Sequence, residues 1–544
     1  MKDIQKQGDR SGVKDVMKSK VSVISVVGMF YAICCAGAYG IEEMVPECGP
    51  GLTIIMLLVL PIVWAYPYGM ICAEMGAIRP VEGGSMIWVK EALGEFWFAI
   101  MAFSNVIWGL VCNTVYVVLS ISYLGSFVEL TELEAYLLKL LLIVIFFIIN
   151  VLGLKEVSVV STVLSIIILI AFAACAVVGF LNWNQSPMDP FIPDDVGVFE
   201  GVGAGLAIGI WMYSGFDELS LFGGEIKDSG RVIPKALMIV IPLITLTYVL
   251  PTLAGLASVG QWEAWTTESG GIGYSTILTD NLGAVFGVIF MIVAIIGQCS
   301  IFNVCLATGS RCILILSDEH LGPQFFAKLT KKKGSPYVGL IIVAAVSAVL
   351  IPFSFDFLVV IDVFFMVIVT ALTVIAAFIL RRATPKDEIS FKIPGGTPMH
   401  TLMCASVLII CVLSTLLNGT DWFLGGLLWI LVVPILYIIC KRIYGGLTVK
   451  DPEKYPINPR TKLGRNDLFK LGGFYMGLGV FTLLARWFLQ WYEGSWAEEY
   501  YLEEWGTGLF SDFGMMLTVI TVTGIITCVA GALFWLAGKK LEKF

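Results

Sequence analysis

The chain has 544 residues, of which 58% are hydrophobic and only 14% are charged, and its formal net charge is −8. Soluble domains carry about 25% charged residues, so this composition excludes a soluble globular protein and indicates an integral membrane protein in contact with lipid. The acidic balance gives no reason to expect nucleic acid as a partner.

Apolar runs of about 20 residues, the length that crosses a bilayer, recur along the whole chain. We expect helices rather than a barrel because the runs are uninterrupted, whereas barrel strands alternate over about ten residues. About fourteen spans are predicted, so both termini lie on one side. They lie near 21–43, 51–77, 92–124, 133–152, 157–181, 201–222, 233–258, 279–314, 337–353, 356–380, 399–417, 420–440, 468–490 and 509–537.

Lysine and arginine are distributed unevenly between the loops. Of the 34 basic residues, all but Lys139 and Arg486 fall in the first 20 residues or in every second loop after them. The alternate loops are acidic and aromatic. Because cytoplasmic loops carry the excess of Lys and Arg, both termini are predicted to be cytoplasmic, in a protein of the plasma membrane.

Cysteine and histidine give no sign of a metal site. The 13 cysteines form no CxxC or Cys/His cluster, and only Cys48 is expected in an outer loop. The two histidines, His320 and His400, fall in or beside cytoplasmic loops, which excludes a histidine proton relay within the membrane. We expect no metal, no cofactor and no enzymatic activity.

The first span contains a break. The stretch "CAGAYGIEEMVP" at 35–46 places Gly37–Ala38–Tyr39–Gly40 inside an apolar run and follows it with Glu42 and Glu43. Glycine weakens a helix, and a carboxylate is costly beside hydrocarbon. The helix is therefore predicted to be interrupted near 37–40.

The sixth span carries a similar break. The stretch "GIWMYSGFDELSLFGGEIK" at 209–227 contains Trp211, then Ser214–Gly215–Phe216, and then the adjacent acids Asp217 and Glu218. Five spans separate the two breaks, so the broken segments cross in opposite directions, as expected of an inverted repeat with a central site.

The predicted fold is therefore an all-α membrane protein with a 5+5 inverted repeat and discontinuous helices 1 and 6. The repeats are spans 1–5 and spans 6–10, followed by four further spans and a linker. The predicted parts are a tail at 1–20, repeats at 21–181 and 201–380, spans 11–12 at 399–440, a cytoplasmic linker at 441–467, spans 13–14 at 468–537 and a tail at 538–544.

Acids in the breaks indicate the chemistry of the ligand. Neighbouring residues on a helix point about 100° apart, so at most one acid of each pair faces a central cavity. A carboxylate at that depth without a Lys or Arg partner must meet a cation, become neutral or reach water. The natural partners are a cationic substrate and a proton, and Trp211 offers a π face for an ammonium or guanidinium group.

Two stretches carry a family resemblance. In "AEMGAIRPVEGGSMIWVKEALG" at 73–94, and in "SGFDELSLFGGEIKDSGRVIPKAL" at 214–237, several residues match the amino acid–polyamine–organocation transporters. They are Glu74, Pro80, Gly83, Gly84, Trp88, Gly94, Glu225, Lys227, Arg231 and Pro234. The chain resembles this superfamily over about residues 20 to 440.

Within the superfamily the chain is most similar to the polyamine uptake branch. The break around Glu42, Trp211 in the sixth span and Asn113 and Tyr116 in the third span follow that branch. Where those transporters often carry aspartate, the third span has Cys112 and Ser122, which counts against a doubly or triply charged substrate. The resemblance and the breaks together give the substrate-site candidates Gly37, Ala38, Tyr39, Gly40, Glu42, Asn113, Tyr116, Trp211, Ser214, Gly215, Phe216 and Asp217.

Coupling remains open at this stage. Carboxylate protonation is the simplest mechanism, with Glu42, Asp217, Glu218 and Glu74 as candidates, Glu74 being either a gate or a structural acid. Asp362 is a further intramembrane acid whose facing the sequence does not determine. Gln298, Ser300 and Asn303 in the eighth span either complete the site or bond neighbouring helices.

The predicted function is secondary active transport of an amine-bearing molecule, a cationic amino acid or a polyamine, by alternating access and with proton coupling. The alternatives are a neutral amino acid transporter, a substrate–substrate antiporter and a transport-inactive sensor on the same fold. A channel is disfavoured because the glycines lie in two unlike breaks rather than in a repeated filter.

Overall fold

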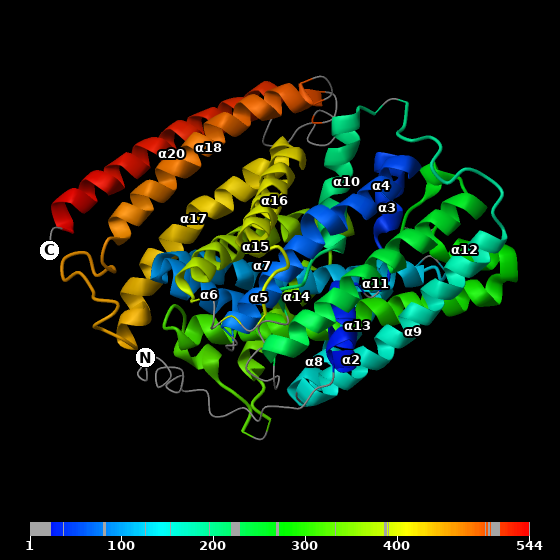
Figure 1. Ribbon diagram of the computed structural model, residues 1–544, viewed down its shortest axis with the longest axis horizontal. Coiled ribbons are helices and arrows are strands. Elements are labelled where there is room, and N and C mark those ends of the chain that lie inside the picture. Colours follow the sequence, from blue (N-terminus) through cyan, green and yellow to red (C-terminus); the bar gives the residue numbers. More distant parts are fainter. Residues whose placement is uncertain are drawn as a thin grey trace.

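The structure is a computed structural model built from helices (Figure 1). It describes residues 23–35, 37–79, 83–125, 127–152, 154–194, 196–218, 229–267, 271–331, 333–385, 389, 391–494, 497–498, 501 and 512–542. Pro80, Glu225 and Lys227, which contribute to the family resemblance, lie outside these residues. Within the described ranges the chain forms helices and no β-strand, as the uninterrupted apolar runs predict.

Eleven helical segments in the described chain are long and apolar enough to cross a membrane. The first is the pair α4 and α5, joined by a π-helical turn at Pro61–Ala65. The helices are α4 (Pro50–Leu60), α5 (Tyr66–Ile78), α7 (Glu95–Gly125), α8 (Glu132–Leu152), α9 (Leu154–Leu181), α11 (Ser229–Ser258), α13 (Ala284–Asp318), α15 (Phe355–Ala383), α16 (Gly396–Leu417), α17 (Thr420–Tyr444), α18 (Asp467–Glu493) and α20 (Phe513–Leu541).

The remaining three predicted spans coincide with shorter helices. They are α2 (Val23–Cys34) with α3 (Ile41–Cys48), α10 (Val198–Met212), and α14 (Tyr337–Leu350). The short helices α6 (Gly84–Leu93) and α12 (Tyr274–Leu282) precede α7 and α13.

Two spans begin a few residues after the predicted positions. The spans expected from 92 and 279 begin at Glu95 and Ala284, because a glycine separates each from the short helix before it. Gly94 has φ +83° and Gly283 has φ +99°, a backbone conformation that ends a helix and that other residues adopt with strain.

The longest helices, α7 and α13, cross at the centre of the bundle through a pair of glycines. A Cβ atom on Gly109 would lie 3.0 Å from the Cα atom of Gly309, so the two backbones are in direct contact. Small residues at a crossing allow this approach in a membrane, where packing rather than water drives association.

The pair α18 and α20 lies along one edge of the molecule (Figure 1). Gly472 and Gly479 on α18 approach Gly531 and Gly524 on α20, and a Cβ atom on Gly479 would lie 2.7 Å from the carbonyl oxygen of Gly524. The two helices therefore pack backbone to backbone along most of their length.

The helix bundle has two chemically different ends. At the basic end, Lys90 Nζ lies 2.7 Å from Glu319, and Lys441 Nζ lies 2.6 Å from Glu95. At the opposite, acidic end, α3 carries Glu43 and packs against the loop that precedes α12. The terms basic end and acidic end are used below in this sense.

Candidate functional site

Both predicted helix interruptions are present and lie against each other. Helix α2 ends at Cys34 and α3 begins at Ile41, while α10 ends at Met212. Gly215 has φ +89°, and a Cβ atom there would lie 3.0 Å from Ile33 and 3.3 Å from the sulfur of Cys34. The two breaks thus meet at the centre of the chain's fold, and only a residue without a side chain fits at this contact.

A small cavity opens between the breaks. Its walls come from α2 and its break, α7, α10 and its break, α11 and α13, and most of them are apolar or aromatic. The lining residues are Ile33, Cys34, Cys35, Tyr39, Tyr116, Trp211, Met212, Ser214, Tyr248, Gln298 and Ile301. Its volume of about 10 Å³ holds about one water molecule, so an organic substrate requires the surrounding helices to move apart.

Four predicted site residues line this cavity: Tyr39, Tyr116, Trp211 and Ser214. Gln298 of α13 also lines it, whereas Asn303, five residues further on, accepts a hydrogen bond of 3.0 Å from Asn150 of α8. Both roles expected of the polar residues in the eighth span are therefore present: Gln298 lines the cavity, and Asn303 joins α13 to α8.

Tyr248 on α11 is a cavity residue that the sequence analysis missed. Its hydroxyl oxygen lies 3.0 Å from the carbonyl oxygen of Cys34 and 2.8 Å from that of Met212, so it serves the last carbonyls of both broken helices. A helix end leaves its final carbonyl groups without partners, and at this depth a side chain must supply them. The available signal was weak, because Tyr248 is one of several hydroxyl residues in this span, with Thr245, Thr247 and Thr252.

We expect Tyr248→Phe to weaken the junction of the two breaks. A buried carbonyl left without a donor costs about 1–3 kcal/mol, so the variant's melting temperature in detergent should fall. The matched control is Tyr475→Phe, which removes a 2.8 Å bond to Leu431 in the α17–α18 contact, away from the cavity. Both variants lose stability, but only Tyr248→Phe should also lose ligand-induced stabilisation; equal ligand responses would contradict the assignment.

Aromatic rings form a layer across the cavity. Trp211 stacks on Tyr116 with ring centroids 5.8 Å apart and meets Phe355 of α15 edge-on at 5.5 Å. Gly40 permits this position, because a Cβ atom there would lie 3.0 Å from the Trp211 ring. The indole Nε1 of Trp211 is buried and has no hydrogen-bond partner in the described part of the chain, so a polar group remains available at the cavity.

On the acidic side of this layer, Tyr39 packs against Tyr123 and Phe172 at 5.1 and 4.8 Å. Beyond it lies a second cavity of about 30 Å³ that Glu42 and Tyr123 help to line. Tyr39 therefore separates the two cavities.

Glu42 and Glu43 point to different partners, as their 100° separation predicts. Glu42 is buried, accepts a 2.9 Å hydrogen bond from the backbone N–H of Gly40 and lies 3.3 Å from the hydroxyl of Tyr123. Glu43 instead accepts 2.6 Å and 2.5 Å hydrogen bonds from the backbone N–H and the hydroxyl of Thr267. Glu42 thus faces the second cavity, while Glu43 fastens α3 to the loop before α12.

Asp217 and Glu218 also separate. The Asp217 carboxyl is buried beside the hydroxyls of Tyr68 on α5 and Ser85 on α6, and it does not line the cavity. Glu218 turns toward α13 and lies next to Thr308, with Asp362 of α15 close enough to interact electrostatically. The sequence favoured Asp217 as the acid nearest the site; in the structure Glu218 lies on the side of α7, α13 and α15.

Other candidates occupy supporting positions. Asn113 donates hydrogen bonds to the carbonyl oxygens of Gly109 and Cys305, the second at 3.2 Å, and so joins α7 to α13 beside their glycine crossing. Phe216 is buried near Gly69 of α5. Ala38 is fully buried, and Gly37 has φ +111° with no room for a side chain beside Phe172.

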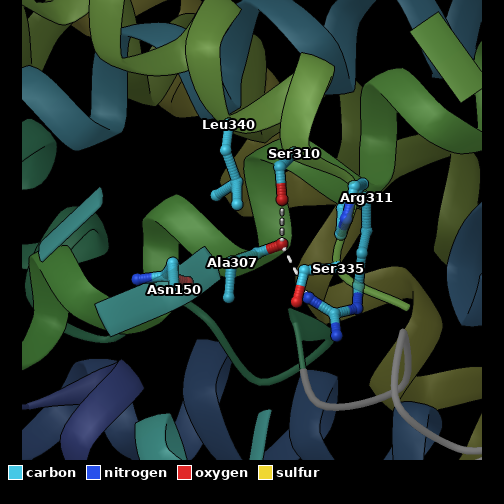
Figure 2. A pocket seen from close by; sticks show the side chains of 7 residues that line it. Asn150, Ala307, Ser310, Arg311, Ser335 and Leu340 are labelled. Carbon is cyan, nitrogen blue, oxygen red and sulfur yellow. Dashed lines mark hydrogen bonds between the residues drawn. The ribbon is translucent and has the colours of Figure 1, made fainter. Parts of the chain in front are cut away.

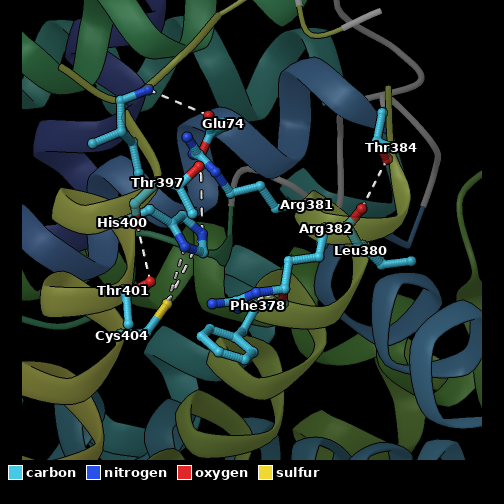
Figure 3. A network of polar contacts seen from close by, with 11 residues as sticks. Glu74, Phe378, Leu380, Arg381, Arg382, Thr384, Thr397, His400, Thr401 and Cys404 are labelled. Atoms are coloured by element: carbon cyan, nitrogen blue, oxygen red, sulfur yellow. Dashed lines mark hydrogen bonds and ion pairs between the residues drawn. The ribbon is translucent and has the colours of Figure 1, made fainter. Parts of the chain in front are cut away.

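Glu74 belongs to a polar network at the basic end (Figure 3). It pairs with Arg381 of α15, accepts a 3.3 Å hydrogen bond from the backbone N–H of Ile393 and lies 3.9 Å from His400 of α16. Arg79, which follows Glu74 by five residues in the chain, pairs with Glu91 at 3.2 Å. Glu74 therefore ties α5 to α15 and α16 and lies away from the central cavity.

A further cavity between α8, α13 and α14 has different chemistry (Figure 2). It holds about one water molecule, and Ser310 and Arg311 both donate to the carbonyl oxygen of Ala307, at 2.8 and 3.1 Å. No acid lines it among the described residues, so it offers no site for a cation.

The bundle of membrane-crossing helices, the paired interruptions and the buried cavity between them define an integral membrane protein with the architecture of a transporter. Residues 21–440 match the family model described as amino acid permease. The chain therefore belongs to the amino acid permease family. This confirms the resemblance seen in the sequence and places the protein among transporters rather than enzymes.

Similar curated proteins cover most of the chain at modest identity. A probable polyamine transporter of Arabidopsis thaliana is 27% identical over 404 residues, which is 73% of this chain and 79% of the relative. Polyamine transporter PUT1 of Oryza sativa subsp. japonica is 27% identical over 420 residues, or 75% and 77% of the two chains. The vacuolar cationic amino acid transporter 8 of Arabidopsis thaliana is 24% identical over 376 residues, or 66% and 62%.

Proposed function

We propose that this permease is a secondary active transporter of an amine-bearing cation, a polyamine or a cationic amino acid. The observation that carries the proposal is the chemistry at the two breaks. The buried acid Glu42 follows the first break, and Glu218, whose Oε2 atom is buried, follows the second; at the aromatic cavity between the breaks Trp211 presents a ring face and an N–H that has no partner in the described chain. An ammonium group satisfies both carboxylates and aromatic faces, whereas a neutral substrate leaves the acids uncompensated.

The similar proteins agree with this substrate class. Polyamine transporters and a cationic amino acid transporter are among them, and all of these names refer to positively charged substrates. A neutral amino acid is the alternative, since the free N–H groups of any broken helix can hold a carboxylate.

The proposed architecture is fourteen crossings with a 5+5 inverted repeat. Spans 1–5 at 21–181 and spans 6–10 at 201–380 form the two repeats, and the breaks in α2–α3 and after α10 occupy equivalent positions in them. The basic end is proposed to face the cytoplasm, since it gathers the Lys and Arg side chains. Spans 11–14 and the linker at 441–467 then lie outside the repeats, in a protein of the plasma membrane.

Alternating access requires contacts at both ends that break in turn. At the acidic end, the bonds of Glu43 to Thr267 hold α3 against the loop before α12. At the basic end, Glu74 and Arg381 hold α5 against α15. With both contacts closed the central cavity has room for only about one water molecule, so transport is proposed to open one end at a time.

Proton coupling is proposed through a carboxyl group of the second break. Asp217 is buried beside Tyr68 and Ser85, two hydroxyls that serve either protonation state, and it stands apart from the cavity lining. Exchange of substrates without a proton is the alternative.

Counterflow in proteoliposomes tests the function. Vesicles loaded with an unlabelled amine should accumulate external labelled amine, and vesicles loaded with a neutral amino acid of similar size should not. Accumulation driven by the neutral amino acid alone would favour the alternative substrate. Binding of an amine without any counterflow would identify a sensor on the same fold.

A further inference from the structure

Asp362 is a buried acid in the middle of α15. Its side chain is 1% exposed, and its Oδ1 atom has no hydrogen-bond partner within the described ranges. Burying such a group without compensation is costly, so its retention in a membrane helix points to a ligand or to a functional charge.

The position of Asp362 follows from the helix that carries it. Phe355 lies seven residues earlier on α15, and its ring packs against Trp211 of the cavity. Seven residues are about two turns, so both side chains lie on nearly the same face, with Asp362 about 10 Å further toward the basic end. Asp362 therefore lies below the aromatic layer, on the face of α15 that carries Phe355.

The neighbours of Asp362 lie along α7 in the same order. Its carboxyl lies next to the indole of Trp108 and the thiol of Cys112. Cys112 is one turn below Tyr116, which stacks on Trp211. From the cavity toward the basic end, α7 thus carries Tyr116, then Cys112, then Trp108, with Asp362 next to the last two.

A second acid reaches the same depth. Glu218, just after the break in α10, lies within electrostatic range of Asp362, and its Oε2 atom is buried without a partner in the described chain. The buried basic side chains of the described residues, Arg381 and Lys441, are engaged with Glu74 and Glu95, and Arg311 of α13 donates to the carbonyl oxygen of Ala307. Asp362 and Glu218 thus form a pair of acids on which no basic side chain of the described residues acts.

Glu42 forms the other anionic position, beyond Tyr39 on the acidic side. Glu42 therefore lies above the aromatic layer of Tyr116 and Trp211, and Asp362 and Glu218 lie below it. A linear molecule with cationic groups at both ends and an alkyl chain between them matches this order, because the rings of Tyr116 and Trp211 pack against methylene groups while the acids meet the ammonium groups.

We propose that Asp362 is a specificity-determining residue that, with Glu218, receives the second cationic group of the substrate. This inference rests on the proposed transport of amines and goes beyond it, because it makes the protein selective for dications and polycations over monocations. It also reverses the expectation drawn from the third span. Where the resemblance implies an acid, the third span has Cys112, and Asp362 supplies a carboxyl group beside that cysteine from α15.

The test compares 1,4-diaminobutane with 1-aminobutane, which have the same chain and differ in one amine. Affinities are measured by thermal stabilisation and by inhibition of counterflow in the full-length protein. The wild type should bind the diamine at least tenfold more tightly. Asp362→Asn keeps the shape of the side chain and should remove that preference while changing monoamine affinity by less than about twofold. Asp280→Asn, an exposed acid of α12, is the matched control.

A charge exchange tests position as well as charge. Cys112 of α7 neighbours Asp362 of α15. The double variant Cys112→Asp with Asp362→Cys therefore moves the carboxyl group from α15 to α7 at the same depth, and it should restore at least part of the diamine preference. It also serves if Asp362→Asn does not fold.

Three results would overturn the inference: a preserved diamine preference in folded Asp362→Asn, an equal loss for both amines, or a double variant without preference. Failure of the wild type to bind either amine or the cationic amino acid lysine would instead contradict the proposed function itself.

Discussion

Trp211→Ala should reduce substrate affinity about thirtyfold. A desolvated cation over an indole ring gains about 2 kcal/mol or more, and about 1.4 kcal/mol corresponds to a tenfold change in affinity. Trp211 is the residue best placed to make this contact, because it lines the cavity, stacks on Tyr116 and leaves its N–H without a partner in the described chain. The measurement is substrate-dependent thermal stabilisation of purified protein.

Trp487→Ala provides the matched control for this prediction. Trp487 lies on α18 with 75% of its surface exposed, far from the breaks, so its removal should leave affinity unchanged. Trp211→Phe keeps a ring face without the N–H and should retain most of the affinity. A folded Trp211→Ala protein with wild-type affinity would mean that the indole only packs between α10 and α15.

Asp217→Asn should abolish pH-driven accumulation while leaving substrate exchange intact. A pH difference of one unit stores about 1.4 kcal/mol per proton, enough for about tenfold accumulation with one proton per substrate. The variant should lose this accumulation because asparagine cannot carry a proton, whereas counterflow should continue because Asp217 does not line the cavity. Both assays are run on the same proteoliposomes.

Glu218→Gln and Asp280→Asn make this result interpretable. Glu218 lies next to Thr308 and near Asp362, so its variant should lose affinity and thus fail in both assays. Asp280 is exposed on α12, so its variant should behave as the wild type in both. If Asp217→Asn retains normal pH-driven uptake, the proton is carried by another carboxyl group, of which Glu42 is the next candidate.

The distribution of side chains along the chain was sufficient to predict an all-helical membrane protein and both helix interruptions. Long uninterrupted apolar runs form helices inside a bilayer, because a helix pairs every backbone N–H and C=O group within the segment. Glycines beside acids mark the places where that pairing fails. The breaks between Cys34 and Ile41 and after Met212 follow from these local rules.

Only the tertiary structure shows in which direction each acidic side chain points. Adjacent residues on a helix point about 100° apart, so the sequence limits the choice without making it. The structure turns Glu42 toward the second cavity and Glu43 toward Thr267, and it places Glu218 rather than Asp217 on the side of Asp362. The partner of Glu74 was equally out of reach, because Arg381 is 307 positions away along the chain.

Tyr248 and Asp362 show the same division most clearly. Each is a polar residue in a mostly apolar span, and a sequence cannot tell a side chain that bonds its own helix from one that reaches another. Only the packing of α11 and α15 against the breaks brings the hydroxyl of Tyr248 to two carbonyl groups and the carboxyl of Asp362 to Cys112. The hydropathy of a segment and the positions of its glycines affect only neighbouring residues, and these local features determine where the helices form and where they are interrupted. The site depends on contacts between residues far apart in the chain, which only the packed bundle decides.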